Sequence, residues 1–520
     1  MTSDRGFNVQ QFVVTAAQMR QIESRVFAAG MPVAALMEKV AGRITQRVKA
    51  LPRYRSGLRV GVLVGPGHNG GDALVVAREL HFSGCEVKLY QPIETLKDLT
   101  AAHASYCHSL GLPVSNTVAS LSDCELLIDG LFGFGLERSL TGDIATAINQ
   151  INQWSIPVVS IDLPSGLHTD TGQVLGTAIQ ASFTLCLGLW KLGLLQDHAL
   201  PWVGQAELVE FDVPLADIQA VVGTEPVRRI TPAVAIAHLP LQRSLTAHKY
   251  TVGHELLVCG SRRYVGAAVL AGLGARASGV GMVTIAVPET IKPWLSDRLP
   301  EALIVGCPET ATGAIAELPL ELVAYDAIAC GPGMTLDALP VIQHVLASDR
   351  PLILDADGLN ALAQLGATVS LQTRTAPTVL TPHLGEFKRL FPDLTDALRC
   401  RLTAVKQAAA LTGAIVVLKG ARTAIADAHT VWVNPDSTPA LARGGSGDVL
   451  TGLTGGLLAQ AIAAQQPVTP LEVVKSAAWW HAQAGILAAQ ERTVLGVDPA
   501  TLANYLIPAI ALPHPPPTRF

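Results

Sequence analysis

A glycine-rich segment in the second half of the chain has the residue types of a phosphate-binding site. Residues 444–448 read Gly-Gly-Ser-Gly-Asp and open an apolar, glycine-dotted stretch that predicts a helix. Backbone amides at a helix N-terminus bind anions, and the helix dipole favours a phosphoryl group there. Asp448 stands where a general base would act. Because an acidic residue in the first helical turn also stabilises a helix, the spacing alone leaves both roles open for Asp448.

Three further polar motifs in this half of the chain follow predicted strands. Residues 419–423 (KGART) offer two cations, a glycine and a hydroxyl to a phosphate. Residues 355–360 (DADGLN) and 381–386 (TPHLGE) also follow apolar runs. Because ligands of open α/β sheets bind outside the carboxyl ends of the strands, we expect these segments to meet at one site. A lone histidine such as His383 is usually structural, but its place in this set favours a role in binding.

The first half of the chain has its own glycine-rich strand ends. Residues 65–72 (GPGHNGGD) would let the backbone approach a ligand at a helix N-terminus, and the phosphate of a dinucleotide is a ligand that suits such a site. Their spacing differs from the GxGxxG fingerprint. Residues 129–135 (DGLFGFG) and 162–166 (DLPSG) follow two more apolar runs, so we expect all three motifs at one edge of a sheet. Asp129 and Asp162 are candidates for chemistry, although turn capping stays open for both.

The elements that must hold these motifs alternate between strands and helices in both halves. In the first half we expect helices at 15–29, with Thr15 as N-cap and Gly30 as stop, and at 32–51 and 72–82. Apolar runs predict strands at 58–64, 87–90, 125–128, 156–161, 255–259, 282–287, 327–329, 351–354, 378–380 and 415–418. Buried parallel strands read as such continuous apolar runs, so the fold class is α/β.

Length and composition predict more than one domain. The 520 residues are 49% hydrophobic and 15% charged, so the chain can bury one or more large cores, and its length favours two to four domains. The β-α rhythm lapses between about residues 213 and 242, where four prolines interrupt it. We therefore expect domains at 12–220 and 236–512, joined by a linker at 221–235.

Charge, cysteines and targeting signals exclude several classes of protein. The net charge is −5 and no run of Lys or Arg matches a nucleic-acid backbone, so we expect no nucleic-acid partner. Eight cysteines without CxxC spacing predict reduced core residues and a cytoplasmic protein. The first residues are polar and predict no export, and residues 449–471 contain glycines, polar residues and a proline that favour a packed helix and loop over a membrane span. Residues 513–520 are expected to be a frayed end.

The motifs GPGHNGGD, IDGLFGFGL and IDLPSG resemble the epimerase domain of the NAD(P)H-hydrate repair enzymes over about residues 12–215. The resemblance implies a Rossmann-like three-layer domain that interconverts the R and S forms of hydrated NADH and NADPH. It implies that Asp162 is the acid/base and that Asn69, Asp129 and Ser165 bind K⁺. It also implies dinucleotide contacts from His68, Asn69, Gly70, Gly71, Asp72, Gly133, Phe134, Gly135, Leu136, Glu137, Arg138, Ser139 and Asp162.

Two features of this half bear on the chemistry. Many family members have Asn where this chain has His68, and a histidine can also donate one hydrogen bond. The hydrated nicotinamide carries a hydroxyl on C6 beside the ring nitrogen, so inversion breaks and remakes a C–O bond with proton transfer. One positioned carboxylate can mediate that transfer.

The motifs GSRRYVGA at 260–267 and GPG at 331–333, with the strand ends above, resemble the ribokinase-like dehydratase domain of the same family over about residues 235–510. The resemblance implies ADP as co-substrate with Mg²⁺, and conversion of the S hydrate to NAD(P)H with release of AMP and phosphate. Eukaryotic members prefer ATP, and the fused architecture favours ADP here. The implied hydrate contacts are Ala267, Gly333, His383 and Asp448, and the implied nucleotide contacts are Lys419, Gly420, Ala421, Arg422, Thr423 and Gly447. The loop at 434–439 lacks a glycine common in relatives.

The two resemblances support each other. Asp448 would deprotonate the C6 hydroxyl, which would take the terminal phosphoryl group and then leave as phosphate. A dehydratase specific for one epimer would leave the other epimer unrepaired. A fused epimerase would convert that epimer into the one that the dehydratase uses. Two alternatives stay open: a vitamin or sugar kinase of the ribokinase type, which leaves GPGHNGGD unexplained, and a non-catalytic scaffold, which leaves the polar strand ends without a purpose. We also expect a homo-oligomer with no membrane partner.

Overall fold

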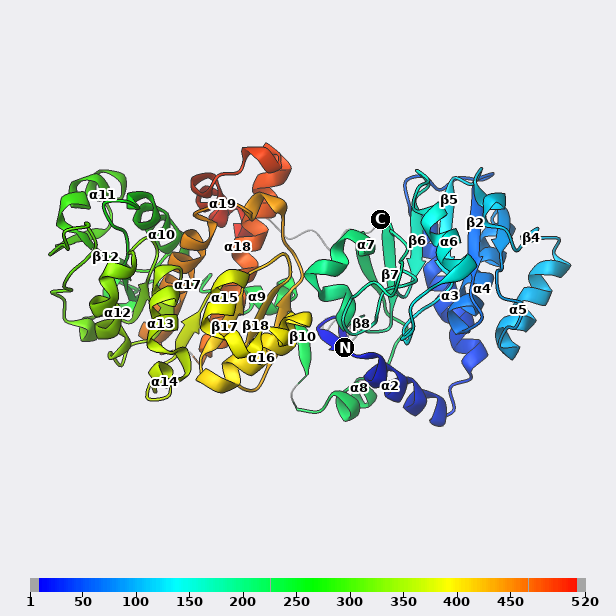
Figure 1. Ribbon diagram of the computed structural model, residues 1–520, viewed down its shortest axis with the longest axis horizontal. Helices are drawn as coiled ribbons and strands as arrows, with labels where there is room; N and C mark the ends of the chain where they lie inside the picture. The colour runs from blue at the N-terminus through cyan, green and yellow to red at the C-terminus, as the bar shows by residue number, and fades with distance from the viewer. Residues whose placement is uncertain (1–8, 225, 466, 512–520) are drawn as a thin grey trace. The chain divides into compact units, whose positions relative to one another are not determined.

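The computed structural model describes residues 9–224, 226–465 and 467–511 (Figure 1). These residues divide into two compact units, and the division falls between Pro226 and Val227. Within the described ranges, no helix combines the length and apolar character needed to cross a membrane. The tail at 513–520, predicted to fray, lies outside the described residues.

The N-terminal unit is built on a parallel sheet with the strand order β4-β3-β2-β5-β6-β7-β9. Its strands are β2 (Arg59–Val64), β3 (Glu86–Tyr90), β4 (Val114–Ser115), β5 (Leu126–Gly130), β6 (Val158–Ile161), β7 (Phe183–Leu187) and β9 (Gln205–Val209). Strand β1 (Phe12–Val14) pairs in parallel with β8 (Trp190–Lys191). Val62 and Leu63 of β2 belong to different hydrophobic clusters, because neighbouring side chains point to opposite faces. The sheet is therefore the middle layer of three.

Among the helices of this unit, α2 begins at a side-chain cap and α4 begins after a glycine. They are α2 (Ala16–Ala28), α3 (Val33–Lys49), α4 (His68–Phe82), α5 (Asp98–Ser109), α6 (Gly142–Ile151), α7 (Leu200–Val203) and α8 (Leu215–Val222). Thr15 caps α2 in a capping box with Gln18, which confirms the predicted start. Helix α4 begins at His68, earlier than the predicted residue 72. Gly70 lies in its first turn, and this position requires glycine because a Cβ there would lie 1.9 Å from the carbonyl oxygen of Gly65.

The C-terminal unit has a sheet in the order β13-β12-β11-β14-β15-β16-β17-β18-β19-β10. Pairing is parallel from β13 to β17, antiparallel through β18 and β19, and parallel again to β10. The strands are β10 (Val227–Arg229), β11 (His254–Val258), β12 (Met282–Pro288), β13 (Leu303–Cys307), β14 (Ala327–Cys330), β15 (Leu352–Leu354), β16 (Thr378–Leu380), β17 (Ile415–Leu418), β18 (Thr423–Ala426) and β19 (Val431–Asn434). Strand β10 lies in the range expected as linker.

Helix α17 is the element that carries the glycine-rich segment. Gly452 packs so closely on α10 that a Cβ would lie 1.9 Å from the carbonyl oxygen of Ala271, and the residues of α17 from Val449 to Gln460 are buried. The glycines of this uncharged stretch therefore serve close helix packing. The helices are α9 (Pro232–Ile236), α10 (Val265–Ser278), α11 (Lys292–Arg298), α12 (Leu339–Leu346), α13 (Asp357–Leu365), α14 (Ala367–Leu371), α15 (Leu384–Leu390), α16 (Arg401–Thr412), α17 (Ser446–Ala463), α18 (Pro470–Arg492) and α19 (Pro499–Ala511).

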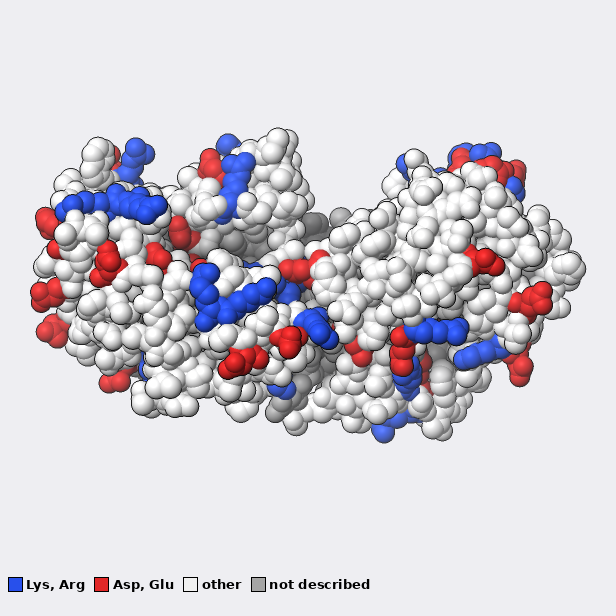
Figure 2. Space-filling model, viewed as in Figure 1, with Lys and Arg blue, Asp and Glu red and all other residues white. Residues whose placement is uncertain are grey.

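The surface and the cysteines agree with the composition. Figure 2 shows acidic and basic residues scattered in small groups over one face, with wide uncharged areas between them. All eight cysteines are free thiols, and each is buried except Cys400, which is partly exposed.

Candidate functional sites

A cavity of about 540 Å³ lies at the carboxyl ends of the central strands in the N-terminal unit. The segments that follow β2, β5 and β6 all reach it, as the strand-end motifs predict. The predicted residues that line it are His68, Asn69, Asp72, Gly133, Phe134, Gly135, Leu136, Arg138 and Asp162. Four other predicted contacts do not line the cavity, namely Gly70, Gly71, Glu137 and Ser139.

Asp162 is held rigidly at the end of β6. Its Oδ1 atom lies 2.6 Å from Nζ of Lys191, and its Oδ2 atom accepts a hydrogen bond of 2.9 Å from the backbone amide of Phe134. Its φ of 68° is in the left-handed region, which a residue other than glycine adopts only when its surroundings enforce it. The carboxylate is therefore fixed in orientation and charge-paired.

Two ionisable residues that line this cavity, Lys191 and Glu23, lie outside the strand-end motifs. Burial alone would lower the pKa of Lys191, but the adjacent Asp162 raises it above its ordinary value. Lys191 is fully buried and follows an apolar run, which is a pattern that indicates a paired cation. Glu23 comes from α2, where nothing in its neighbourhood distinguishes it from a surface residue. Burial raises the pKa of Glu23 to about 7, with Lys191 opposing the shift and Asp162 adding to it.

Two more titratable groups line the cavity. Burial raises the pKa of Asp72 well above its usual range, and the nearby Asp162 and Glu23 add to the effect. Burial lowers the pKa of His68, and Lys97 lowers it further. The imidazole of His68 is thereby kept neutral at physiological pH, which leaves it one hydrogen-bond donor.

Of the predicted K⁺ ligands, Asn69 lines the cavity, and Asp129 and Ser165 do not line it. Asp129 is fully buried, and its Oδ1 atom accepts a hydrogen bond of 2.6 Å from Oγ of Ser165. The carbonyl oxygen of Phe132 lies 3.2 Å from the same hydroxyl. Burial raises the pKa of Asp129, and its bonds with Ser165 oppose that shift. Among the described residues, the buried Nδ2 atom of Asn69 has no hydrogen-bond partner.

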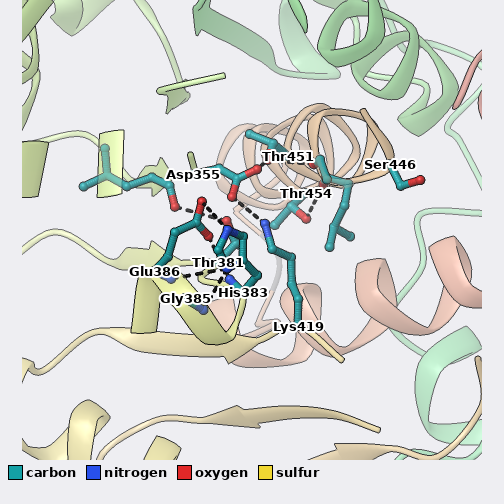
Figure 3. A network of polar contacts seen from close by, with 12 residues as sticks. Asp355, Thr381, His383, Gly385, Glu386, Lys419, Ser446, Thr451 and Thr454 are labelled. Carbon is teal, nitrogen blue, oxygen red and sulfur yellow. Dashed lines mark hydrogen bonds and ion pairs between the residues drawn. The ribbon is translucent and has the colours of Figure 1, made fainter. Parts of the chain in front are cut away.

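In the C-terminal unit the strand ends meet beneath the first turns of α17 (Figure 3). Asp355 follows β15 and is buried, and its Oδ1 atom lies 2.6 Å from Nζ of Lys419, which follows β17. Its Oδ2 atom accepts a hydrogen bond of 2.9 Å from Oγ1 of Thr451 on α17. Burial would raise the pKa of Asp355, but Lys419 and its hydrogen bonds lower it, so this carboxylate is ionised.

Asp448 lies in the first turn of α17 beside this pair, without an ion-pair partner of its own among the described residues. Burial raises the pKa of Asp448 to about 7, Asp355 adds to the shift and Lys419 opposes it. A Cβ on Gly447 would lie 3.2 Å from Nζ of Lys419, so two predicted nucleotide contacts are adjacent. Gly445, with a φ of 99°, precedes the helix in a conformation that glycine adopts readily.

The remaining predicted residues fall into three local groups. The Nδ1 atom of His383 accepts hydrogen bonds from the amides of Gly385 and Glu386, so this side chain caps α15 while remaining half exposed. A Cβ on Gly333 would lie 2.8 Å from that of Ala267, which makes these two residues neighbours. The third group, Gly420, Ala421, Arg422 and Thr423, forms the turn into β18 and the start of that strand after Lys419.

Comparisons with known proteins match both halves of the chain. The family model described as NAD(P)H-hydrate dehydratase matches residues 255–508, and the one described as YjeF-related protein N-terminus matches residues 33–193. The bifunctional NAD(P)H-hydrate repair enzyme of Synechocystis sp. is 55% identical over 500 residues, covering 96% of this chain and 94% of the relative. That of Thermosynechococcus vestitus is 53% identical and covers 96% of this chain and 97% of the relative.

The chain also matches solved structures. One is the ADP/ATP-dependent NAD(P)H-hydrate dehydratase from Bacillus subtilis, co-crystallised with ATP/Mg²⁺. It is 34% identical, covers 54% of this chain and 96% of its own, and has a TM-score of 0.46.

Proposed function

The chain belongs to the family of bifunctional NAD(P)H-hydrate repair enzymes, and from that premise we propose that it both epimerises hydrated NADH or NADPH and dehydrates the S form back to the reduced dinucleotide. The observation that carries this proposal is that the two matched regions fall in different units, each with its own set of titratable groups at strand ends. The N-terminal unit is assigned the epimerisation and the C-terminal unit the dehydration.

In the N-terminal unit, Asp162 is the proposed acid/base at C6 of the nicotinamide ring. Its ion pair with Lys191 and its bond from Phe134 fix the carboxylate at the cavity wall. The clustered oxygens of Asp129, Ser165 and Phe132 are of the type that hard cations prefer. Asp129, Ser165 and Asn69 would hold K⁺, which would supply a fixed positive charge near the bound dinucleotide.

In the C-terminal unit, Asp448 is the proposed base. With a pKa raised to about 7, it can take the proton of the C6 hydroxyl at neutral pH. The terminal phosphoryl group of the nucleotide would transfer to that oxygen, with charge stabilised by Lys419 and the amides at the start of α17. Loss of phosphate then restores the ring double bond, because phosphate is a better leaving group than water.

We propose ADP as the nucleotide, with Mg²⁺ bound to its phosphates. Mg²⁺ is usually held by one or two carboxylates together with substrate phosphates and water. The described residues contain no group of three His, Cys, Asp or Glu side chains arranged for a dedicated metal cage, so a nucleotide-borne ion suits this site. Asp355 and Asp357, which follow β15 and both raise the pKa of Asp448, are the carboxylates that we propose would contact it.

The test is a chromatographic assay that resolves both hydrate epimers, using the full chain with and without ADP. The wild-type protein should interconvert the epimers without nucleotide and consume both when ADP is present. Asp448→Asn should retain interconversion and lose dehydration by about 10² to 10⁴-fold, whereas Asp162→Asn should leave the R epimer unconsumed. Asp396→Asn, on an exposed segment, is the matched control. Near-full dehydration by Asp448→Asn would refute the assignment.

Further measurements address the substrate class, the nucleotide, the role of K⁺ and the oligomeric state. Replacing ADP by ATP at equal concentration tests which nucleotide is used. Replacing the hydrate by a vitamin or sugar alcohol distinguishes the repair enzyme from a kinase of the ribokinase type. Removing K⁺ should slow the epimerisation and leave the dehydration unchanged. Homo-oligomerisation remains a prediction, which light scattering after size exclusion would test.

A further inference from the structure

Helix α2 forms one wall of the N-terminal cavity. Arg20, Glu23 and Phe27 all line the cavity, and their spacing of three and four residues places them on one face of the helix. This face packs on the loop after β5, since a Cβ on Gly135 would lie 2.5 Å from Nη2 of Arg20. Asp162 borders the same cavity from the end of β6. Two carboxyl groups, from Glu23 and Asp162, therefore face one substrate-sized space from different elements.

The two carboxyl groups differ in what binds them. Asp162 accepts hydrogen bonds from Lys191 and from two backbone amides, those of Phe134 at 2.9 Å and Leu187 at 3.3 Å. The carboxyl group of Glu23 forms no hydrogen bond or ion pair with any described residue. Burial raises the pKa of Glu23 to about 7, so at neutral pH a large fraction of it carries a proton. The cavity thus combines an anchored, charge-paired carboxylate with a carboxylic acid that can give its proton away.

We propose that Glu23 is the second acid/base residue of the epimerisation, acting on the face of the nicotinamide ring opposite to Asp162. This inference rests on the proposed epimerase function of the N-terminal unit. Inversion at C6 requires that the departing and the entering oxygen lie on opposite faces of the ring. A single carboxylate anchored by three donors serves one face, so a second group is needed on the other.

In one direction of the epimerisation, Glu23 gives its proton to the C6 hydroxyl. The lone pair of the ring nitrogen forms the C6=N bond, and the C6–O bond breaks to release water. A water molecule then adds to C6 from the opposite face and gives a proton to Asp162, while the C=N electron pair returns to nitrogen. In the reverse direction the two carboxyl groups exchange roles. The proton returns from Asp162 to Glu23 through the water of the cavity between turnovers.

The experiment follows the interconversion in water enriched in ¹⁸O, with the full chain and without nucleotide, so that no hydrate is dehydrated. Wild-type protein should introduce ¹⁸O at C6 with each inversion, beyond the uncatalysed exchange. Glu23→Gln should lower kcat by about 10² to 10⁴-fold, the usual contribution of one general acid, with KM changed by less than threefold. Glu23→Asp should keep an intermediate rate, since it retains a shorter acid.

The controls separate this inference from the function on which it rests. Glu86→Gln, an exposed glutamate at the edge of β3, should match the wild type. A wild-type protein that fails to accelerate the interconversion contradicts the epimerase function itself. A Glu23→Gln variant within threefold of the wild-type kcat, or a wild type that inverts C6 without uptake of ¹⁸O, overturns the role of Glu23 while leaving that function in place. The isotope measurement needs no variant and is independent of whether Glu23→Gln folds.

Discussion

The N-terminal and C-terminal units each hold a buried aspartate 2.6 Å from a lysine at the strand ends, but they use the pair differently. In the N-terminal unit the paired carboxylate is Asp162, the proposed acid/base itself. In the C-terminal unit the pair is Asp355 with Lys419, and the proposed base Asp448 lies beside it without a partner among the described residues. The same local chemistry therefore holds the proposed acid/base in one site and flanks the proposed base in the other.

The difference shows what a paired lysine contributes. Each site also has a carboxyl group with a pKa raised to about 7, namely Glu23 in the N-terminal unit and Asp448 in the C-terminal unit. In both cases burial is the main cause, the paired aspartate adds to the shift and the lysine opposes it. A Lys–Asp pair thus supplies a fixed charge beside a group that can change its protonation state near neutral pH. We regard Glu23, rather than Asp162, as the counterpart of Asp448 in proton transfer.

The largest expected effect comes from breaking each pair. Lys191 is fully buried, whereas the side chain of Lys419 is 22% exposed. Removing one partner of a buried ion pair costs about 3–5 kcal/mol, because the other charge is left without compensation. Lys191→Met should therefore reduce the protection of β6 and β7 against hydrogen exchange by about that amount, and Lys419→Met should have a smaller effect on β15 and β17. The measurement is hydrogen–deuterium exchange of the full chain.

The control for that comparison is the double variant Lys191→Met/Asp162→Asn, in which no unpaired charge remains. It should recover part of the lost protection. Equal losses in the two single variants would mean that the exposure of the lysine does not determine the cost.

A tenfold effect for each pH unit is expected in the dehydration rate. Asp448 acts as a base only when deprotonated, so kcat/KM should rise with pH through about 7 and then level off. Asp355 raises the pKa of Asp448 and Lys419 lowers it, so Asp355→Asn should move the midpoint to lower pH. The measurement is the pH profile of dehydration for both proteins. An unchanged midpoint would contradict the proposed coupling between Asp355 and Asp448.

The sequence predicts the strand-end motifs of both sites because the carboxyl ends of parallel strands lie at one edge of a sheet. Gly447 and Lys419, far apart in the chain, are adjacent as this rule requires. Thr15 could be predicted as a cap because the capping box is local. The α/β fold and the two kinds of unit follow from the same regularities.

The partners that tune these sites could not be predicted in the same way. Lys191 meets Asp162 only because β7 pairs with β6, and no local pattern specifies that contact. Glu23 reaches the cavity because α2 packs on the loop after β5, which depends on the whole domain. Helix α4 starts earlier than expected because Gly70 and Gly71, which the sequence presents as turn-forming glycines, lie in its first turn.

A further effect is expected from a buried carboxyl group that has no lysine beside it. Glu255 on β11 is fully buried, and among the described residues neither of its carboxyl oxygens has a hydrogen-bond partner. It fits against α17 because positions 455 and 456 are glycines, and a Cβ on Gly455 would lie 2.0 Å from Oε1. Burial raises the pKa of Glu255 well above its ordinary value.

This carboxyl group should make the C-terminal unit less stable as the pH rises. Above pH 4.5 the unfolded chain releases the proton of Glu255 while the folded chain keeps it, so unfolding becomes more favourable by about 1.4 kcal/mol per pH unit until the folded pKa is reached. Glu255→Gln should remove that dependence, and Glu255→Leu should also raise stability at pH 7 by about 1–3 kcal/mol, because no buried polar group is left unsatisfied. Thermal unfolding from pH 5 to 8 measures both effects, with the exposed Glu321→Leu as the matched control. A wild-type pH dependence that survives in Glu255→Gln would show that another group carries it, and that a buried carboxyl group without a lysine is tolerated here at no cost.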